Sequence, residues 1–382
     1  YAIFLSFFLC GLCGNAEAKK KKEVKKAIKR EVQTPYDKLF KGKKAFTVNG
    51  LMKMHLMAGK VYAEFPIELL NRDLALTSSI EDISDNGEGV VGQFAGRVNQ
   101  FRFTLQDSML QARLVRRYGV KNTGMGKNAD QIIERSNTPG IFQSYKILAY
   151  TPDKKAVVVD MTELFLESSR LTNPFPSYAG NSLYGFVQRI HKFQSQRSEL
   201  LGICGNDNSM SVRCNLGFNV DRLVLGSFMQ AKDVPVSVTV NKILMLLPED
   251  PMRPRLADSR IGVNAIIQTE LPDVCQGIKT YYITKRWRIE PVDEIRYKQG
   301  EMVDVKKPIV FYIDTLMPDS WKPYIKEGVE EWNKSFEKIG YLNAVQAKEW
   351  PKGTDFSSSN IRHSSICYAP DWMYMAQTSM HT

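Results

Sequence analysis

The stretch from Lys307 to Pro351 reads KPIVFYIDTLMPDSWKPYIKEGVEEWNKSFEKIGYLNAVQAKEWP and decides the fold of the C-terminal part of this chain. It opens with Ile309–Ile313, a short apolar run of β-branched and aromatic residues, which predicts a buried strand. A second strand is expected at Ala344–Ala347. Because the residues between these strands have helical periodicity, the stretch predicts a βαβ unit and the start of a parallel sheet.

The segment between the two strands has the spacing of one long amphipathic helix. Its apolar residues recur at steps of three and four, the period of an α-helix, over about six turns. They are Trp321, Ile325, Val329, Trp332, Phe336 and Ile339. Pro318–Ser320 supplies residues that start helices, and Gly340 is placed to end this one. We therefore expect the aromatic residues of the stripe to pack against the sheet.

The particular residues of this unit say more than its periodicity. Two runs, KKPIVFYID and WKPYIKEGVEEWNKSFEKIGYLNA, closely resemble the opening of the catalytic domain in a family of bacterial secreted zinc-dependent metalloproteases of met-zincin type. Similar blocks occur upstream in the order that the family shows. They are VYAEFPIELLNRDL (61–74), VVVDMTELF (157–165), RSEL (197–200), LPEDPMRPRLADSRIG (247–262) and TKRWRIEP (284–291). Together these blocks span most of residues 34–370.

The resemblance implies an α+β chain, in which an antiparallel β-rich accessory region precedes a zincin-like α/β subdomain of strand, long helix and strands. The length of the chain separately favours two or three domains. The expected divisions are a signal peptide (1–18), a basic disordered leader (19–33), a small N-terminal accessory domain (34–80), a β-rich accessory domain (81–247), a connecting segment (248–306) and an incomplete zincin-like catalytic domain (307–382).

The first residues have the features of an export signal. Ile3–Leu12 is apolar and is followed by Ala16-Glu17-Ala18, so cleavage after Ala18 is expected. Lipid attachment at Cys10 or Cys13 is the alternative, although each follows Leu rather than a small residue. The run is too short to span a bilayer, which needs about 20 apolar residues. We therefore expect a periplasmic, outer-membrane-associated or extracellular protein.

The net charge of +11 suggests nucleic-acid binding, but the distribution of the charge argues against it. Much of the basic charge lies in one run, KKKKEVKKAIKR, at residues 19–30. Such a run is typical of a solvated, disordered leader, and weak contact with an anionic membrane surface is the alternative. We therefore expect no nucleic-acid partner.

Residues 34–247 have the alternating pattern of antiparallel strands and few helical patterns. A short helix is expected at Thr34–Gly42, with Thr34 as its cap. Residues 170–190 are rich in Asn, Pro, Ser and Gly, which predicts a long loop. The expected strands are Phe46–His55, Lys60–Phe65, Phe101–Leu105, Leu110–Leu114, Phe142–Tyr150, Lys155–Asp160, Leu216–Gln230 and Val234–Leu247.

Three acidic residues in this region, Asp160, Glu163 and Glu167, could act as paired carboxylates. However, a helix is expected to begin at Thr162, and acidic residues near the positive end of a helix explain the pattern more simply. The sequence itself gives no acid and base geometry for these side chains. We therefore do not assign them to a site.

The cysteines offer a possible covalent link. Cys204 and Cys214 enclose a polar loop, and in an oxidising compartment they could form a disulfide or remain unpaired thiols. These two residues, Cys275 and Cys367 show no C-x-x-C spacing. A structural zinc site is therefore not expected.

A zincin needs two His one helical turn apart, a third beyond a Gly turn, and a Glu beside the first. The 4 His of this chain are His55, His191, His363 and His381, and no H-E-x-x-H occurs. His363 and Cys367 have helical metal-site spacing, but Ile361–Tyr368 has a strand pattern that would separate them by about 13 Å. We expect no catalytic residue, metal ligand or cofactor in this chain, whereas zinc is the cofactor implied for the intact enzyme.

The resemblance implies the N-terminal portion of a secreted zinc metalloprotease, which would hydrolyse a protein or peptide substrate with zinc-activated water. The chain alone is expected to be inactive, because it lacks the catalytic motif. The alternative is a non-catalytic exported binding or pro-region module. A motif H-E-x-x-H-x-x-G-x-x-H encoded after Thr382 would decide for the protease.

Overall fold

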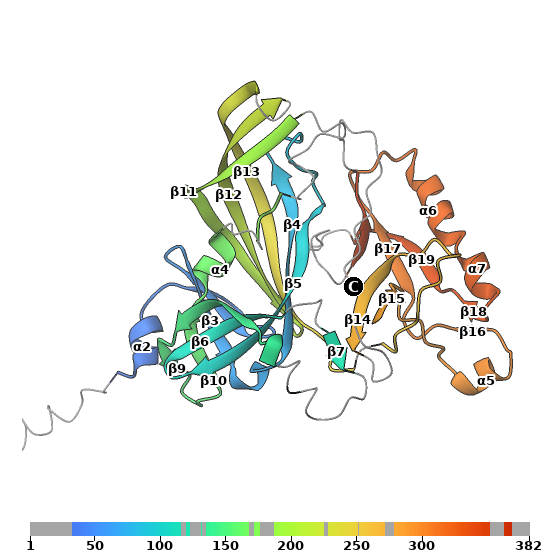
Figure 1. The fold of residues 1–382 in the computed structure, drawn as a ribbon, viewed down its shortest axis with the longest axis horizontal. Helices are drawn as coiled ribbons and strands as arrows, with labels where there is room; N and C mark the ends of the chain where they lie inside the picture. Colours follow the sequence, from blue (N-terminus) through green and yellow to red (C-terminus); the bar gives the residue numbers. More distant parts are fainter. Residues whose placement is uncertain are drawn as a thin grey trace, which may run out of the picture.

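The computed structural model describes residues 33–115, 120–122, 131, 135–167, 172–175, 187–224, 228–250, 252–271, 279–351 and 363–368. Over these residues the chain is mostly β-strand with few helices, as the sequence predicts. Figure 1 shows a β-rich part beside a smaller C-terminal part. The predicted signal peptide and nearly all of the basic leader lie outside the described residues. In the part of the chain that the structure describes, no helix is long and apolar enough to cross a membrane.

The N-terminal residues form a short helix and a five-stranded sheet. Helix α2 (Pro35–Phe40) begins as predicted, because Thr34 Oγ1 accepts the N–H of Asp37 and the Asp37 carboxylate accepts the N–H of Thr34. The strand order is β1-β2-β3-β10-β9. The bounds are β1 (Phe46–Val48), β2 (Lys53–Met57), β3 (Lys60–Pro66), β9 (Ala149–Tyr150) and β10 (Ala156–Asp160). The predicted strand Phe46–His55 is broken in two, since Leu51 and Met52 turn into the core.

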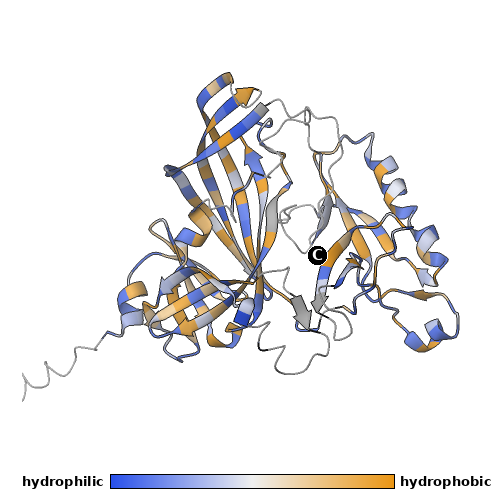
Figure 2. Ribbon diagram, viewed as in Figure 1, coloured by the Kyte–Doolittle hydropathy of each residue, from blue (hydrophilic) through white to orange (hydrophobic). Residues whose placement is uncertain are grey.

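Seven antiparallel strands form the larger sheet, in the order β11-β12-β13-β4-β5-β6-β8. Their bounds are β4 (Asp73–Ile83), β5 (Phe94–Gln106), β6 (Met109–Val115), β8 (Gly140–Lys146), β11 (Val187–Asn206), β12 (Ser209–Val224) and β13 (Phe228–Leu246). The predicted hairpin of Phe101–Leu105 and Leu110–Leu114 is confirmed as β5 and β6. Hydrophobic and hydrophilic residues alternate along several of these strands (Figure 2), as expected for a half-buried sheet.

Strand β11 is the largest departure from the sequence prediction. A loop is predicted over residues 170–190, but β11 begins at Val187 and pairs with β12 as far as Asn206. Polar and charged residues dominate this edge strand, and its register shifts between Gln194 and Glu199. Both features hide the alternation by which strands are recognised. The extent of β11 is therefore set by its backbone pairing with β12 rather than by a local sequence pattern.

The predicted strands Leu216–Gln230 and Val234–Leu247 are displaced relative to the structure. Strand β12 ends at Val224, and β13 begins at Phe228. Residues 231–233, which separate the two predicted strands, lie inside β13, and Asp233 there has a φ of 53°. It marks an irregularity in the pairing of β12 and β13 rather than a chain reversal.

One hydrophobic core joins the two sheets. Phe65 of β3 and Phe103 of β5 are buried, and their ring centroids lie 4.8 Å apart. The same cluster includes Met210 of β12 and Leu244 of β13. The division expected at residue 80 falls inside β4, whose Leu74 belongs to this core. Residues on both sides of that division therefore bury apolar surface against each other.

Helix α4 (Thr162–Leu166) ends against the larger sheet. The Cys214 thiol donates to the Phe165 carbonyl, with Sγ 3.3 Å from the oxygen, and Lys242 Nζ donates to the Glu167 carbonyl at 2.6 Å. The last carbonyls of a helix have no intrahelical partner, so these side chains satisfy them. Lys242 is only 1% exposed, and burial lowers the pKa of its amine to about 8.

Cys204 and Cys214 are free thiols, so the disulfide that the sequence allows does not form. In the register of β11 and β12, Cys204 lies opposite Ser211 and Cys214 lies opposite Leu200. Cys204 is exposed, whereas Cys214 is buried. Burial raises the pKa of Cys214 to about 11. Cys275 lies outside the described residues.

The segment expected to connect the two parts contains sheet structure of its own. Strands β14 (Ala265–Leu271) and β15 (Lys279–Thr284) are antiparallel, and β14 also pairs in parallel with β7 (Val120–Asn122). After helix α5 (Glu294–Lys298), strand β16 (Val303–Asp304) pairs with β18 (Tyr341–Leu342). These pairings tie the segment to both neighbouring parts.

The C-terminal part confirms the predicted βαβ unit. Strand β17 (Ile309–Ile313) is the centre of a parallel sheet with the order β19-β17-β20. Strand β19 (Val345–Glu349) is the predicted second strand. Strand β20 (Ser364–Ile366) lies inside the predicted strand Ile361–Tyr368. Helices α6 (Lys322–Glu330) and α7 (Asn333–Glu337) lie between β17 and β19 in the chain.

The predicted single helix is wrong, because α6 ends at Glu330 and α7 begins at Asn333. Neither helix has a side-chain cap, so Pro318–Ser320 does not start the helix through its side-chain oxygens. The apolar stripe is divided by this break. Its inward members are Ile325, Val329 and Phe336, which pack against the sheet clusters. Its outward members are Trp321, Trp332 and Ile339, which are 52%, 64% and 56% exposed.

Substitution of Trp332 tests whether this residue faces solvent rather than the sheet. We expect Trp332→Ala to change the free energy of unfolding by less than about 0.5 kcal/mol, as exposed substitutions do. Phe336→Ala should cost about 2 kcal/mol or more, because its ring packs against the C-terminal core. Thermal unfolding followed by circular dichroism measures both. Equal losses for the two variants would show that the stripe packs as the sequence predicts.

Candidate functional site

His363 and Cys367, which the sequence spaces like helical metal ligands, flank strand β20. Four residues of extended chain cover about 13 Å. The His363 ring lies against Tyr312, with centroids 5.2 Å apart. The structure shows Ser364–Ile366 of the predicted strand Ile361–Tyr368 as a strand, and the spacing of His363 and Cys367 at its two ends does not fit a zinc site. Over the described ranges, no three His, Cys, Asp or Glu side chains form a group that could hold a metal ion.

The acidic residues Asp160, Glu163 and Glu167 lie around α4 and line a shallow hollow of about 390 Å³. Asp160 accepts hydrogen bonds from Lys60 Nζ at 2.9 Å and from the N–H of Thr162 at 3.0 Å, at the start of the helix. Burial and the neighbouring Glu163 charge raise the pKa of Glu167. The structure thus brings these three carboxylates together. However, Asp160 accepts the N–H of Thr162 at the start of α4, which agrees with the interpretation of these acidic residues as belonging to a helix start.

Among the described residues, a charge cluster is centred on the buried Glu88, in the loop 84–93 between β4 and β5. His191 Nε2 lies 2.8 Å from Glu88 Oε2. Arg222 Nε and Nη2 donate to Glu88 Oε1 at 2.9 and 2.8 Å, and Arg189 Nε lies 3.2 Å from the same oxygen. The Glu88 side chain has no exposed surface. A buried carboxylate therefore has three cationic or hydrogen-bonding side chains around it.

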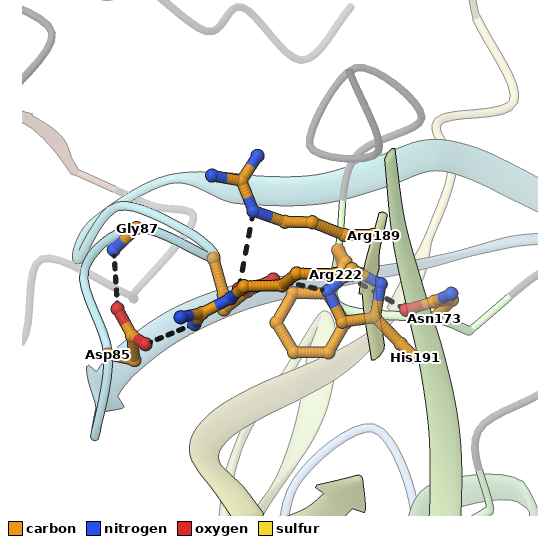
Figure 3. Close-up of polar contacts among 8 residues, drawn as sticks. Asp85, Gly87, Asn173, Arg189, His191 and Arg222 are labelled. Atoms are coloured by element: carbon orange, nitrogen blue, oxygen red, sulfur yellow. Dashed lines mark hydrogen bonds and ion pairs between the residues drawn. The ribbon is translucent and has the colours of Figure 1, made fainter. Parts of the chain in front are cut away.

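A second carboxylate extends this group, which we call the Glu88 cluster (Asp85, Glu88, Arg189, His191 and Arg222). Asp85 pairs with Arg222 Nη2 and accepts the N–H of Gly87 at 2.9 Å, as Figure 3 shows. Two carboxylates therefore face two guanidinium groups. This balance reduces the cost of burying each charge.

Strand pairing explains how the cluster assembles. Arg189 and His191 are two positions apart on β11, so both project from one face of the sheet. Arg222 of β12 lies opposite Arg189 in the register. Two like charges opposite each other repel unless an anion lies between them. Glu88 supplies that anion from a loop about a hundred residues earlier in the chain.

Aromatic rings cover one side of the cluster. The Phe175 ring stacks on His191, with centroids 3.9 Å apart and planes inclined by 12°. Phe218 of β12 packs edge-on against Phe175. The Asn173 side chain accepts the N–H of Phe175 at 2.9 Å and fixes the approach of this segment (Figure 3). These contacts remove water from the imidazole and strengthen its bond to Glu88.

The electrostatics of the cluster favour ionised carboxylates. Burial alone would raise the pKa of Glu88, but hydrogen bonds from His191 and Arg222 hold the pKa below its ordinary value. Burial would likewise raise the pKa of Asp85, but the hydrogen bonds from Arg222 and Gly87, together with the charges of Arg222 and Arg189, hold that pKa below its ordinary value. The cluster has no nucleophile, and its charges are paired with one another. The ion pairs of the cluster therefore hold the loop 84–93 against β11 and β12.

A second polar network lies on the five-stranded sheet. Glu64 of β3 accepts a hydrogen bond from Tyr36 Oη at 2.6 Å and lies 2.9 Å from His55 Nε2. The other ring nitrogen of His55 lies 2.8 Å from Thr47 Oγ1. Thr47 and His55 are directly opposite in the register of β1 and β2. The network is a cross-strand ladder that joins α2 to the sheet.

Sequence reasoning missed both networks. His55 and His191 stand alone in the sequence, and neither has a ligand or base at a recognisable spacing. One sequence feature could have indicated the Glu88 cluster, namely the spacing of Arg189 and His191, which places both side chains on one face of a strand. That feature is informative only if residues 187–206 are first recognised as a strand. Of the predicted candidates, His381 lies outside the described residues.

Comparison with known families adds two assignments. Residues 92–292 match the family model described as Domain of unknown function (DUF5117), and residues 33–83 match the one described as Domain of unknown function (DUF5118). No curated protein and no solved structure matches the chain. Arg189, His191 and Arg222 fall within the longer match, whereas Glu88 lies between the two. The longer match covers more than half of the 382 residues of this chain, so the chain belongs to the family described as Domain of unknown function (DUF5117).

Proposed function

We propose that this chain is the N-terminal portion of an exported zinc metalloprotease of met-zincin type. The β-rich part is its accessory region, and residues 307–382 begin a zincin-like catalytic domain. The observation that carries the proposal is the parallel sheet β19-β17-β20, with α6 and α7 between its first two strands in the chain. Strand, helix, strand and strand follow one another in the order of a zincin domain. The sequence resemblance across residues 34–370 supports the same reading.

Zinc would be the cofactor of the intact enzyme, and a protein or peptide would be its substrate. The residues of this chain do not supply the zinc site. The sequence contains no H-E-x-x-H, and His363 and Cys367 lie at opposite ends of β20. The 382-residue chain is therefore expected to hydrolyse no peptide bond by itself.

The proposal includes export, which rests on Ile3–Leu12 and the small residues that end at Ala18. The basic run at residues 19–30 would then begin the mature protein. Its charge suits a weak contact with an anionic membrane surface. No nucleic-acid partner is proposed.

The coding sequence after Thr382 provides the first test. We expect an H-E-x-x-H-x-x-G-x-x-H motif within about a hundred codons. The gene product with this motif should cleave fluorescent casein, and a chelator or a Glu→Gln change in the motif should abolish cleavage. The 382-residue chain serves as the matched inactive control. A missing motif, or cleavage that survives both treatments, contradicts the proposal.

A non-catalytic exported binding or pro-region module is the second candidate. It is favoured by the charge clusters of the β-rich part, in which paired side chains fix loops and strands rather than face a reacting group. The same gene sequence separates the two candidates. A coding sequence that lacks the zinc motif, with a secreted product that binds but does not cleave proteins, would support this second function.

A further inference from the structure

The loop 84–93 is held firmly to the β-rich part. The Gly92 N–H donates to the Ile80 carbonyl at 2.8 Å, and the Gln93 N–H donates to the Val90 carbonyl at 3.1 Å. A side chain at Gly89 would lie 2.9 Å from Ile80 Cδ1, so the loop packs closely on β4. The Glu88 cluster adds the ion pairs to β11 and β12. The loop therefore has one defined position.

The far side of this loop contacts the C-terminal part. A Cβ built on Gly92 would lie 3.7 Å from Cys367 Cβ and 3.8 Å from its Sγ. Cys367 directly follows β20, and Asp314 directly follows β17. The Asp314 N–H donates to the Ile366 carbonyl at 3.0 Å. The loop thus reaches the edge where the parallel strands β17 and β20 end.

We propose that the loop 84–93 is a strap over the carboxyl end of the β19-β17-β20 sheet, and that the Glu88 cluster holds it closed. Ligand sites of open parallel sheets lie outside the carboxyl ends of their strands. The strap would therefore let the β-rich part control access to this edge. The inference deepens the proposed function, since the covered edge would belong to the catalytic domain.

The cluster suits this role because its partners lie on three separate elements. Glu88 and Asp85 come from the loop, Arg189 and His191 from β11, and Arg222 from β12. Loss of the Glu88 charge leaves the half-buried guanidinium groups of Arg189 and Arg222 opposite each other, with Asp85 as the remaining carboxylate of the cluster, which opposes closure. The strap should then open locally, while the sheet cores stay folded.

Three cysteines among the described residues report on this opening. Cys204 is exposed, Cys214 is buried, and Cys367 is of intermediate exposure beside the strap. Maleimide labelling of the full chain, resolved for each cysteine by peptide mass spectrometry, measures the three rates together. Cys204 is the internal control for reagent activity, and Cys214 is the control for an intact fold.

We expect Glu88→Gln to raise the labelling rate of Cys367 about tenfold or more, with the rates of Cys204 and Cys214 unchanged. Glu199→Gln removes an exposed carboxylate from β11 and is the matched control, for which we expect no change. The strap is refuted if Cys367 in the wild type reacts as fast as Cys204. An unchanged Cys367 rate in Glu88→Gln refutes the holding role of the cluster.

A second variant tests the strap even if Glu88→Gln exposes Cys214 through general unfolding. The distance from a Cβ at position 92 to Cys367 Cβ falls within the range of disulfides, which is about 3.5–4.5 Å. Oxidised glutathione should therefore oxidise the two thiols of Gly92→Cys and Cys367 to a disulfide, and be reduced to two glutathione thiols. Gly59→Cys has a similar positive φ in open space and is the matched control. Failure of Gly92→Cys to link to Cys367 would overturn the placement of the strap.

Neither readout involves peptide hydrolysis. A strap that behaves as expected stands even if the longer gene product is not a protease. Conversely, if the longer gene product is an active protease and its Cys367 reacts as fast as Cys204, the proposed function is supported and the strap is refuted. The two proposals can therefore fail separately.

Discussion

Replacing Phe65 with alanine should lower the free energy of unfolding of the β-rich part by about 3–5 kcal/mol, the usual cost of truncating a buried aromatic ring. Phe65 is 0% exposed and lies in the core that joins the two large sheets. Its ring also contacts Phe103, with centroids 4.8 Å apart. Little can move to fill the space, because strands from both sheets surround it.

Two spectroscopic signals make this test specific. The first of the 5 tryptophans is Trp287, so tryptophan fluorescence reports on the C-terminal part, whereas far-ultraviolet circular dichroism reports mainly on the β-rich part. The two parts have separate hydrophobic clusters. We therefore expect Phe65→Ala to shift the dichroism transition in urea and to move the fluorescence transition much less.

The matched control is Phe46→Ala, on the same sheet as Phe65 but 60% exposed. We expect it to cost less than about 1 kcal/mol, because little apolar surface is lost from the core. Equal shifts of both signals in Phe65→Ala would mean that the two parts unfold as one unit. The two parts would then not unfold independently, although their hydrophobic clusters are separate.

Lys242→Met should change the pH dependence of stability. Burial lowers the pKa of Lys242 to about 8 in the folded chain, whereas an unfolded lysine keeps its ordinary value near 10.5. Between these values the unfolded state binds more protons than the folded state. The contribution of Lys242 to stability therefore rises as the pH increases through this window.

Methionine has no titrating group, so the variant lacks this rise. From about pH 7 to pH 10, the stability of the wild type should increase relative to Lys242→Met by about 2 to 3 kcal/mol. Urea unfolding at both pH values measures the difference. The unsatisfied Glu167 carbonyl in the variant is a constant cost, so it cancels when the two pH values are compared.

The control for this prediction is Lys232→Met, an exposed lysine on the same strand. We expect its stability difference from the wild type to be the same at both pH values. A difference for Lys242→Met that is also independent of pH would contradict the prediction. It would show that the buried amine keeps its proton throughout the range.

Local patterns determined much of this fold. The capping box at Thr34 and Asp37, the hairpin of β5 and β6 and the parallel unit of β17 and β19 are all as predicted. Each depends on neighbours in the chain, such as a side chain near free N–H groups or apolar residues at a period of two. Such interactions can be recognised before the rest of the chain is placed.

The long helix shows where local pattern is insufficient. Its apolar spacing is regular, but the structure divides it at Glu331 and Trp332 and leaves Trp332 exposed. A regular stripe indicates which residues could share a face. Whether the helix remains continuous depends on the sheet that it packs against, and that sheet is assembled from β17, β19 and β20.

The sequence by itself determined the strand-rich character of this protein and its parallel C-terminal unit, and it shows no H-E-x-x-H within residues 1–382. Only the tertiary structure decided the course of β11, the burial of Lys242 and the Glu88 cluster. The cluster joins a loop to two strands about a hundred residues later, through charges that the sequence presents as ordinary surface residues. Their burial and mutual distances come from strand register, because pairing Arg189 with Arg222 creates the cationic site that Glu88 occupies.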